Sequence, residues 1–311
     1  MPPSTSTPVP PPPAPPSPAP PSLFPADPQG AAAYAGCQIF PAGDYYNRVV
    51  TSAPVDPKSA AYIQATVDAG DTGGFNMWTP TAEYINLANS ATPRVRTASK
   101  SGHVIPSPFP WAPGFQIQTV SDAHAFVLDT SSCTLYEAYN ASYANGVLSA
   151  YSGEEFDLSK PMMQGETFGS VTAAGIPMFP GLIRPEEIQA GVIKHALYWG
   201  GVYGTLSQTA YVAPATNNDA VPYQGPAGET PLPLGSRLRL RASFPVSGLA
   251  PQAQIVARAM QTYGIILADT GCCDAVESIL PANPSSDPFN AGDLATLNSI
   301  HITDFAVVDS P

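Results

Sequence analysis

The tripeptide Asp-Thr-Gly occurs twice in the chain, in GDTGGFNMWTP (70–80) and in YGIILADTG (263–271). Two aspartates that share one proton can activate a water molecule for hydrolysis. Asp71 and Asp269 are therefore the first residues whose types could do chemistry together. Whether they act as a pair depends on the elements that hold each loop.

The upstream loop continues with Asn76, Trp78 and Pro80, and it resembles the first catalytic loop of pepsin-type aspartic peptidases. In that family each catalytic Asp-Thr-Gly follows a buried apolar strand. The residues GIILA before Asp269 satisfy this condition, whereas the polar QATVDAG before Asp71 does not. Asp, Thr and Gly are also ordinary turn residues. We therefore expect no dyad between the two aspartates, and an aspartic peptidase stays an alternative.

Asp269 has a possible role of its own. It ends the continuous apolar run 263–269, which is typical of a strand buried on both faces. A carboxylate held there is partly desolvated, and desolvation raises its pKa towards the range of a general acid. The alternative is a turn residue that closes a β-connection.

Three more polar residues belong to the predicted hairpin HAFVLDTSSCTLYEAYN (124–140). His124 could pair with Asp122, or satisfy a neighbour on a half-buried strand. Asp129 opens the DTSS turn, which is an ordinary position for aspartate. Glu137 lies on an otherwise apolar or aromatic strand face, where an acidic residue is either paired or functional. We expect Glu137 or Asp129 to supply a second carboxylate, and His124 to orient it.

Candidate substrate ligands are basic, aromatic or imidazole side chains. The arginines of LGSRLRLRAS (234–243) alternate with leucines and share one strand face, which is either solvated or able to bind an anionic glycan such as a uronate polymer. Arg184 and His195 flank or follow a predicted helix, where a surface arginine and a core histidine are the alternatives. The expected substrate-binding residues are Arg184, Arg237, Arg239, Arg241, Tyr136, Tyr139 and His195.

The histidines do not indicate a metal site. None of the four has a partner at His-x-His or His-x-x-x-His spacing. We expect no cofactor, while a metal site assembled from residues distant in the sequence stays open.

Short β-like runs and a few helices must position these residues. Helical patterns cover 184–197, which opens with Pro185 and two glutamates, and 251–264, where Gly264 marks a stop. The remaining periodicity favours strands. The predicted fold class is mainly β with a few short helices.

Five segments together resemble a family of secreted bacterial proteins of unassigned activity. They are CQIFPAGDYYN (37–47), DAHAFVLDTSSCTLYEAYN (122–140), GLIRPEEIQAGVIKHAL (181–197), PLGSRLRLRASFPVSG (233–248) and YGIILADTG (263–271).

The C-terminal third has a second, looser resemblance. PLGSRLRL followed by YGIILADTG is similar to the layout of double-psi β-barrel cell-wall enzymes, which include 3D-type domains and lytic transglycosylases. This resemblance implies a β-barrel core and a catalytic acid at Asp269.

Composition argues against two classes of protein, those that bind nucleic acid and those with a membrane-spanning helix. The 311 residues carry 12 Lys+Arg against 24 Asp+Glu, a formal net charge of −12. Affinity for nucleic acid depends on neutralising phosphates, so no nucleic-acid partner is expected. No stretch reaches the roughly 18–20 apolar residues needed to span a bilayer.

The N-terminal end predicts a spacer. Residues 1–22 contain 12 prolines and no charge, a composition that favours extended polyproline II. We expect a Pro-rich disordered linker at 1–28 and a single β-rich globular domain at 29–311. Because such spacers join modules, we expect a fragment or processed form of a secreted protein, with a binding module tethered beyond the linker.

Four cysteines, Cys37, Cys133, Cys272 and Cys273, allow three pairings. Two long-range bridges are one solution, and Cys37–Cys133 with the adjacent pair left over is another. We expect Cys37 and Cys133 both to be oxidised, and to tie the N-terminal segment to the central hairpin.

These observations converge on a secreted protein that acts on a cell-wall or plant polysaccharide. Asp269 would be the acid that cleaves a glycosidic bond. Two carboxylates roughly 5–10 Å apart would fit hydrolysis, and a single acid would fit lyase or transglycosylase chemistry. The alternative is a non-catalytic glycan-binding module that uses aromatic platforms: Tyr136, Tyr139, Trp199 and Tyr203.

Overall fold

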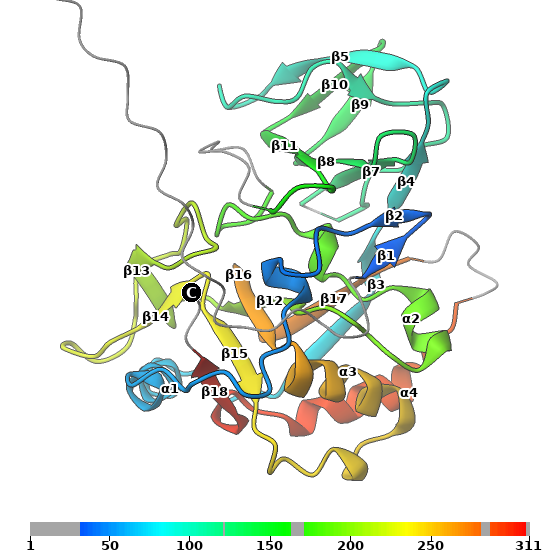
Figure 1. The fold of residues 1–311 in the computed structure, drawn as a ribbon. Helices are drawn as coiled ribbons and strands as arrows, with labels where there is room; N and C mark the ends of the chain where they lie inside the picture. Colours follow the sequence, from blue (N-terminus) through cyan, green and yellow to red (C-terminus); the bar gives the residue numbers. More distant parts are fainter. Residues whose placement is uncertain (1–31, 121, 163–170, 281–286, 309–311) are drawn as a thin grey trace, which may run out of the picture.

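The computed structural model describes residues 32–120, 122–162, 171–280 and 287–308, without the side chains of 78–82. The linker predicted at 1–28 lies outside the described residues. Within them the fold is mainly β with a few short helices, as the sequence predicts. The chain forms a body that contains the largest sheet, and an upper lobe made of residues 84–157 (Figure 1).

A six-stranded mixed sheet organises the body, in the order β18–β15–β16–β12–β17–β3. The bounds are β18 (Phe305–Val308), β15 (Arg237–Leu240), β16 (Ile265–Gly271), β12 (Leu197–Val202), β17 (Ala275–Ile279) and β3 (Asn76–Glu83). β12 is parallel to β16 and antiparallel to β17, so it lies between them. The first four residues of β16 are fully buried, which confirms the strand predicted before Asp269.

The sheet is not a closed barrel, because no pairing joins β18 to β3 within the described residues. Its two edges nevertheless approach each other. The Phe75 amide donates to the Ile300 carbonyl at 2.9 Å, and Gly74 and His301 form an antiparallel bridge. The segments that lead into β3 and β18 therefore lie against each other.

Four α-helices surround this sheet in the described part of the chain: α1 (Ser59–Asp68), α2 (Pro185–Ala190), α3 (Pro251–Thr262) and α4 (Ala291–Leu294). In Figure 1, α3 lies below the sheet. It confirms the helix predicted from its periodicity and buries Val256 and Met260. By contrast, α2 is shorter than the predicted 184–197. Gly191 adopts a left-handed φ of 72° and ends the helix, a conformation that glycine reaches without steric cost.

The upper lobe consists of two four-stranded sheets. One has the order β11–β8–β7–β4 and the other β6–β5–β10–β9. The bounds are β4 (Ile85–Ala88), β5 (Arg94–Ser99), β6 (Phe109–Pro110), β7 (Ala125–Asp129), β8 (Thr134–Tyr139), β9 (Ser142–Ala144), β10 (Val147–Ala150) and β11 (Ser152–Asp157). The antiparallel β7–β8 pair is the hairpin that the sequence predicts.

Strand alternation explains how the lobe joins the body. Successive side chains of a strand point to opposite faces of its sheet. In β7, Phe126 and Leu128 belong to the main core, whereas Ala125 and Val127 belong to a second core between the two upper sheets. The central strands β7 and β8 of the β11–β8–β7–β4 sheet are therefore buried on both faces, and this sheet forms the roof over the body.

Smaller elements complete the description. Two-stranded sheets pair β1 (Ala33–Tyr34) with β2 (Cys37–Gln38) and β13 (Leu206–Tyr211) with β14 (Leu232–Leu234). Short 3-10 helices are Tyr45–Asn47, Phe179–Gly181, Val246–Gly248, Ala295–Ser299 and Ile302–Asp304. A disulfide joins Cys37 to Cys133 and confirms the expected link between the N-terminal segment and the hairpin.

The arginines of β15 correct the prediction of an exposed basic ridge. Arg237 is buried and donates to the carbonyls of Tyr263 and Tyr45. Arg239 donates to the carbonyls of Val50 and Thr51. The alternation that predicts a strand is correct, but the N-terminal segment covers this face, and the guanidinium groups hold it there.

Candidate functional site

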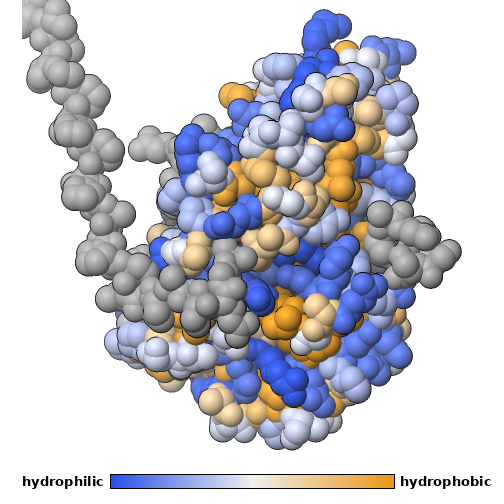
Figure 2. Space-filling model, turned by 45° about the vertical axis from the view of Figure 1, so that its right-hand side comes forward, coloured by the Kyte–Doolittle hydropathy of each residue, from blue (hydrophilic) through white to orange (hydrophobic). Residues whose placement is uncertain are grey.

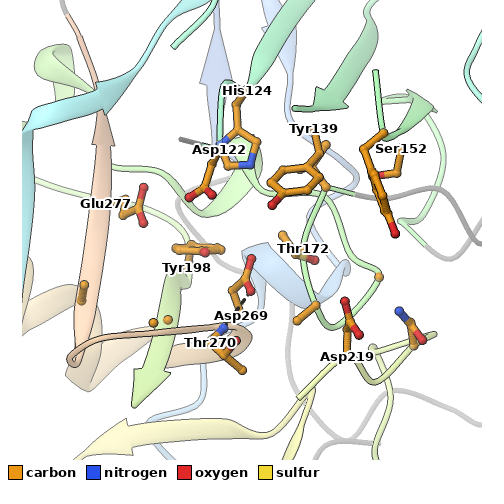
Figure 3. A pocket seen from close by; sticks show the side chains of 18 of the residues that line it. Asp122, His124, Tyr139, Ser152, Thr172, Tyr198, Asp219, Asp269, Thr270 and Glu277 are labelled. Carbon is orange, nitrogen blue, oxygen red and sulfur yellow. Dashed lines mark hydrogen bonds between the residues drawn. The ribbon is translucent and has the colours of Figure 1, made fainter. Parts of the chain in front are cut away.

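A cleft of about 950 Å³ lies where the upper lobe meets the body. Its walls come from both parts: His124 and Tyr139 line it from the upper lobe, and Glu83, Asp269 and Glu277 from the six-stranded sheet. Figure 3 shows His124, Tyr139, Asp269 and Glu277 around one space, with Tyr198 between Glu277 and Asp269 in this view. On the face drawn in Figure 2, hydrophilic and hydrophobic residues are interspersed between lobe and body.

A β-bulge in β16 aims Asp269 into this cleft. Trp199 of β12 pairs with Leu267, but the next residue, Gly200, pairs with Asp269, so that Ala268 is the extra residue. Trp199 and Leu267 point into the main core. The extra residue reverses the alternation, because a bulge shifts the following side chain to the other face. Asp269 therefore shares the cleft face with Gly200.

The Asp269 carboxyl is held by several donors. The Thr270 amide donates to its Oδ1 at 2.7 Å, and the Tyr198 hydroxyl and the Ala173 backbone also hydrogen-bond to it. Burial nevertheless dominates and raises the pKa of Asp269 to about 6. This carboxyl is therefore mostly ionised at pH 7 and becomes protonated in mild acid.

Glu277 lies on the strand that flanks β12 on its other side. In β17, Ala275 pairs with Gly200, which also pairs with Asp269, so both carboxyl-bearing strands meet β12 at the same point. Burial raises the pKa of Glu277 to about 8, with further contributions from Glu83 and Asp269. Glu277 is therefore protonated at pH 7, when Asp269 is not.

Gly200 forms an open floor between the two carboxyl-bearing strands. A Cβ built on it would meet nothing closer than the Tyr198 hydroxyl, at 3.9 Å. Neighbouring strands lie about 4.8 Å apart. Gly200 therefore adds no side chain to the space between the two carboxyl groups, which Tyr198, two residues earlier on β12, borders.

A buried ion pair forms the opposite wall. His124 Nδ1 lies 2.8 Å from Glu83 Oε1, which also accepts a hydrogen bond from Gln118 Nε2 at 2.7 Å. Burial lowers the pKa of His124, but the Glu83 carboxylate outweighs burial and raises it to about 9. Within the described part of the chain, His124 Nε2 is buried and has no hydrogen-bond partner.

The rim of the cleft is acidic and aromatic. Asp122, Asp219 and Tyr139 line it (Figure 3), and so do Tyr151 and Tyr203. No lysine or arginine is among the described residues that line it. Apart from the imidazole side chains, the cleft therefore offers acceptors and tyrosine rings rather than cations.

The structure places three of the predicted site residues in the cleft, namely Asp269, His124 and Tyr139. It places the two expected partner carboxylates elsewhere. Asp129 is buried at the far end of β7, where it pairs with Arg94 and accepts a hydrogen bond from the Ser131 hydroxyl at 2.6 Å. That carboxylate is part of a turn.

Glu137 corrects the other expectation. Its carboxyl accepts hydrogen bonds from the backbone amides of Met178, at 3.0 Å, and Phe179, at 2.8 Å. Burial raises its pKa to about 7, but it does not line the cleft. Glu137 thus satisfies the N-terminal amides of the Phe179–Gly181 turn and joins the roof to the body.

The predicted substrate ligands of the 184–197 segment are also structural. Arg184 is 1% exposed and donates to Glu187 Oε1 at 3.1 Å, and His195 Nε2 lies 3.1 Å from Glu187 Oε2. Burial raises the pKa of Glu187, but His195 and Arg184 outweigh burial and lower it to about 2. These three residues form one buried ionic cluster outside the cleft.

The remaining expected ligands lie away from the cleft as well. Tyr136 belongs to the second core and Trp199 is fully buried. Arg237 and Arg239 hold the N-terminal segment, and Arg241 donates to the Thr303 carbonyl. Of the expected aromatic platforms, Tyr139 and Tyr203 line the cleft.

The two Asp-Thr-Gly aspartates belong to different sites. Asp71 is 2% exposed and interacts with Asp274, whose Oδ1 accepts a hydrogen bond from Trp199 Nε1 at 2.9 Å. Burial raises the pKa of both carboxyls, and their proximity raises that of Asp274 further. Asp269 instead bonds to Thr270 and Tyr198. Asp71 is therefore not in the exposed polar turn that its flanking residues predict.

Sequence reasoning missed several cleft residues, among them Glu83, Glu277 and Tyr198. A signal exists for the two glutamates, because each is the single charged residue in an otherwise uncharged run, TAEYINLA and AVESIL. The same signal also marks Glu137, which is structural. The sequence pattern alone does not separate the two cases.

The cleft can move protons, because it holds carboxyl groups with separated pKa values beside an imidazolium. Among the residues that the structure describes, no cluster of three or more metal-ligating side chains is found. Over the same residues, no helix is long and apolar enough to cross a membrane. No family model, curated protein or solved structure matches the chain.

Proposed function

We propose that the protein cleaves a glycosidic bond of a polysaccharide by general acid–base catalysis in this cleft. The observation that carries the proposal is the pair Asp269 and Glu277, whose environments give pKa values of about 6 and 8 in one accessible site. A pair of titratable groups whose pKa values are pushed apart supports the assignment of one base and one acid.

Glu277 is the proton donor in this proposal and Asp269 the base or nucleophile. At pH 7 a carboxyl with a pKa of about 8 holds its proton, and one with a pKa of about 6 has lost it. Glu277 would protonate the departing glycosidic oxygen while Asp269 activates water or attacks the anomeric carbon. This assignment revises the sequence-based expectation, in which Asp269 was the acid.

His124 would bind and orient the substrate. Its Nε2–H is buried and unpartnered among the described residues, and the Glu83 carboxylate keeps the ring charged. A charged donor of this kind stabilises negative charge on a sugar oxygen as the bond breaks. Tyr198, which hydrogen-bonds to Asp269, would hold the base in position.

The substrate class follows from the charge of the walls. Asp122 and Asp219 add acceptors, and no lysine or arginine lines the described part of the cleft. A uronate polymer would be repelled, because its carboxylates would face Asp122, Asp219 and Asp269, and the charge of His124 is already paired with Glu83. The tyrosine rings of Tyr139, Tyr151 and Tyr203 offer faces for sugar rings. A neutral or amino-substituted polysaccharide is therefore the proposed substrate, in place of the anionic glycan suggested by the arginine pattern.

Secretion and the double-psi arrangement remain part of this proposal. The resemblance to secreted bacterial proteins supports an extracellular location, where polysaccharides occur. The contact between residues 74–75 and 300–301 supports a barrel-like relation between the sheet edges. A barrel of that kind would place Asp269 at the end of an inner strand.

A screen of the purified protein against neutral, amino-substituted and uronate polysaccharides tests the proposal, with reducing-end and unsaturated-uronate readouts. We expect new reducing ends from a neutral or amino-substituted polymer. Glu186→Gln, an exposed glutamate on α2, is the matched control for Glu277→Gln. Binding without cleavage would favour the glycan-binding module, and cleavage of proteins inhibited by a statine peptide would favour the peptidase.

A further inference from the structure

Two adjacent cysteines lie at the lip of the cleft. Cys272 and Cys273 form the turn between β16 and β17, which carry Asp269 and Glu277. Both cysteines line the cleft, Cys272 exposed and Cys273 half-buried. Both are free thiols, whereas the other two cysteines of the chain are joined to each other.

The two thiols interact with each other. Their side chains form a hydrogen bond, and no other cysteine is left to pair with either. Nearby, the Tyr203 amide donates to the Gly271 carbonyl at 2.8 Å, so the strand end before the turn is held to the β12–β13 connection. The turn thus presents two sulfur atoms, in contact, to the space in which a ligand would bind.

We propose that Cys272 and Cys273 are a redox modification site, which closes to a vicinal disulfide by exchange with a small-molecule disulfide such as oxidised glutathione. One thiolate attacks a sulfur of the incoming disulfide, forms a mixed disulfide and releases one thiol. The neighbouring thiolate then attacks the protein sulfur of that mixed disulfide and releases the second thiol. Two protein thiols are oxidised, and one external disulfide is reduced to two thiols.

The order of attack follows from exposure. Burial raises the pKa of Cys273 to about 12, and the neighbouring Cys272 thiol adds to this effect. Exchange requires a thiolate, so the more exposed Cys272 reacts first. Once Cys272 is a mixed disulfide it no longer adds its charge or hydrogen bond, and the pKa of Cys273 falls. The second step is therefore favoured by the first.

The bond formed would be labile. Adjacent Cα atoms are about 3.8 Å apart across a trans peptide, shorter than the roughly 4.4–6.8 Å that ordinary disulfides span. A strained and exposed disulfide has a more oxidising potential and is easily reduced. Cys37 is 1% exposed, so the Cys37–Cys133 bridge would survive conditions that open the turn.

Mass spectrometry of the intact protein tests this site. The protein is treated with mild reductant, equilibrated with oxidised glutathione, and alkylated without further reduction. We expect two alkyl groups before oxidation and none after it, with a mass lower by two hydrogen atoms and no glutathione retained. Peptide mapping should place the new bridge between Cys272 and Cys273.

Single-serine variants identify the two steps. Cys273→Ser removes the resolving thiol, so it should accumulate one glutathione as a stable mixed disulfide on Cys272. Cys272→Ser removes the first nucleophile, so its reaction should be at least about tenfold slower. Two alkylatable thiols after oxidation of the unmodified protein, a stable glutathione adduct on it, or exchange with Cys37 or Cys133 would each overturn the proposal.

Discussion

Segment 265–279 contributes carboxyl groups to two clusters, and of these two only the cluster in the cleft is accessible to solvent. Asp269 and Glu277 lie in the cleft, whereas Asp274, in the turn between them in sequence, pairs with Asp71 outside it. Burial raises the pKa of all four carboxyls. A perturbed pKa is thus common to both clusters, and access to a ligand is what distinguishes them.

The surroundings of the clusters explain the difference. At the cleft, Gly200 leaves the floor open between the two carboxyl-bearing strands. At the other cluster, the Trp199 indole closes over Asp274, and Asp71 is 2% exposed. The sealed cluster lacks room for a substrate, so we expect it to affect stability and not catalysis.

The largest expected effect is on activity at the open cluster. Asp269→Asn and Glu277→Gln should each reduce glycan cleavage about 1,000-fold, because each removes one proton-transfer group. The change in kcat, measured on the polymer that the screen identifies, separates this loss from weaker binding. Equal activity of Asp269→Asn and the unmodified protein would remove Asp269 from the mechanism.

Filling the open floor should have the next largest effect. Gly200→Leu projects a side chain into the gap between the two carboxyl groups and should reduce kcat/KM about 100-fold, because the substrate is displaced. Gly200→Ala is the matched control, since its Cβ meets nothing closer than 3.9 Å. It should retain activity, and the free energy of unfolding should change by about 0.5 kcal/mol or less.

The pH dependence of kcat/KM tests the assignment of acid and base. Asp269 must be ionised, so activity should fall about tenfold per pH unit below about 6. Glu277 must be protonated, so activity should fall in the same way above about 8. In Glu277→Gln the decrease in kcat/KM above about pH 8 should disappear. A decrease that persists in this variant would come from the titration of another group.

The smallest expected effect is at the sealed cluster, and it concerns stability. The pKa values of Asp71 and Asp274 are higher in the folded protein than in the unfolded chain. Their contribution to the free energy of unfolding is therefore complete below about pH 4, and it is lost as the pH rises through the folded-state pKa values. Asp71→Asn removes one of the two titrating carboxyl groups and, with it, the negative charge that raises the pKa of Asp274. The decrease in Tm as the pH rises above about 4 should therefore become shallower.

Activity at pH 7 should be unchanged in Asp71→Asn. Asp68→Asn, at the exposed end of α1, is its control and should leave the Tm profile as it is. A large loss of cleavage in Asp71→Asn would mean that the sealed cluster supports the cleft, and the contrast between the two clusters would fail.

Local pattern predicted the parts that depend on local interactions. The apolar run before Asp269 predicted a buried strand, and the alternation at 124–140 predicted the β7–β8 hairpin. The pairing of Glu83 with His124 could not be predicted in this way, because it depends on contacts between distant segments. The Leu280 amide donates to the Glu83 carbonyl at 2.8 Å across nearly two hundred residues of chain.

The arginine pattern failed for a related reason. Alternation shows which side chains share a strand face, but not what covers that face. For Arg237 and Arg239, the cover is the segment that contains Tyr45 and Val50, and their charges are satisfied by backbone carbonyls. The burial of the Asp71–Asp274 pair could not be predicted either, because the Gly-rich residues beside Asp71 are typical of an exposed turn.

The disulfide between Cys37 and Cys133 encloses a loop of chain that contains α1, β3 and four strands of the upper lobe, β4, β5, β6 and β7. A protease that cuts once within this loop, for example in the exposed turn at 99–102, leaves both fragments covalently joined. The nicked protein would run as one band on a non-reducing gel and as two after reduction. The lobe can thus tolerate a backbone cut that would otherwise release its N-terminal half.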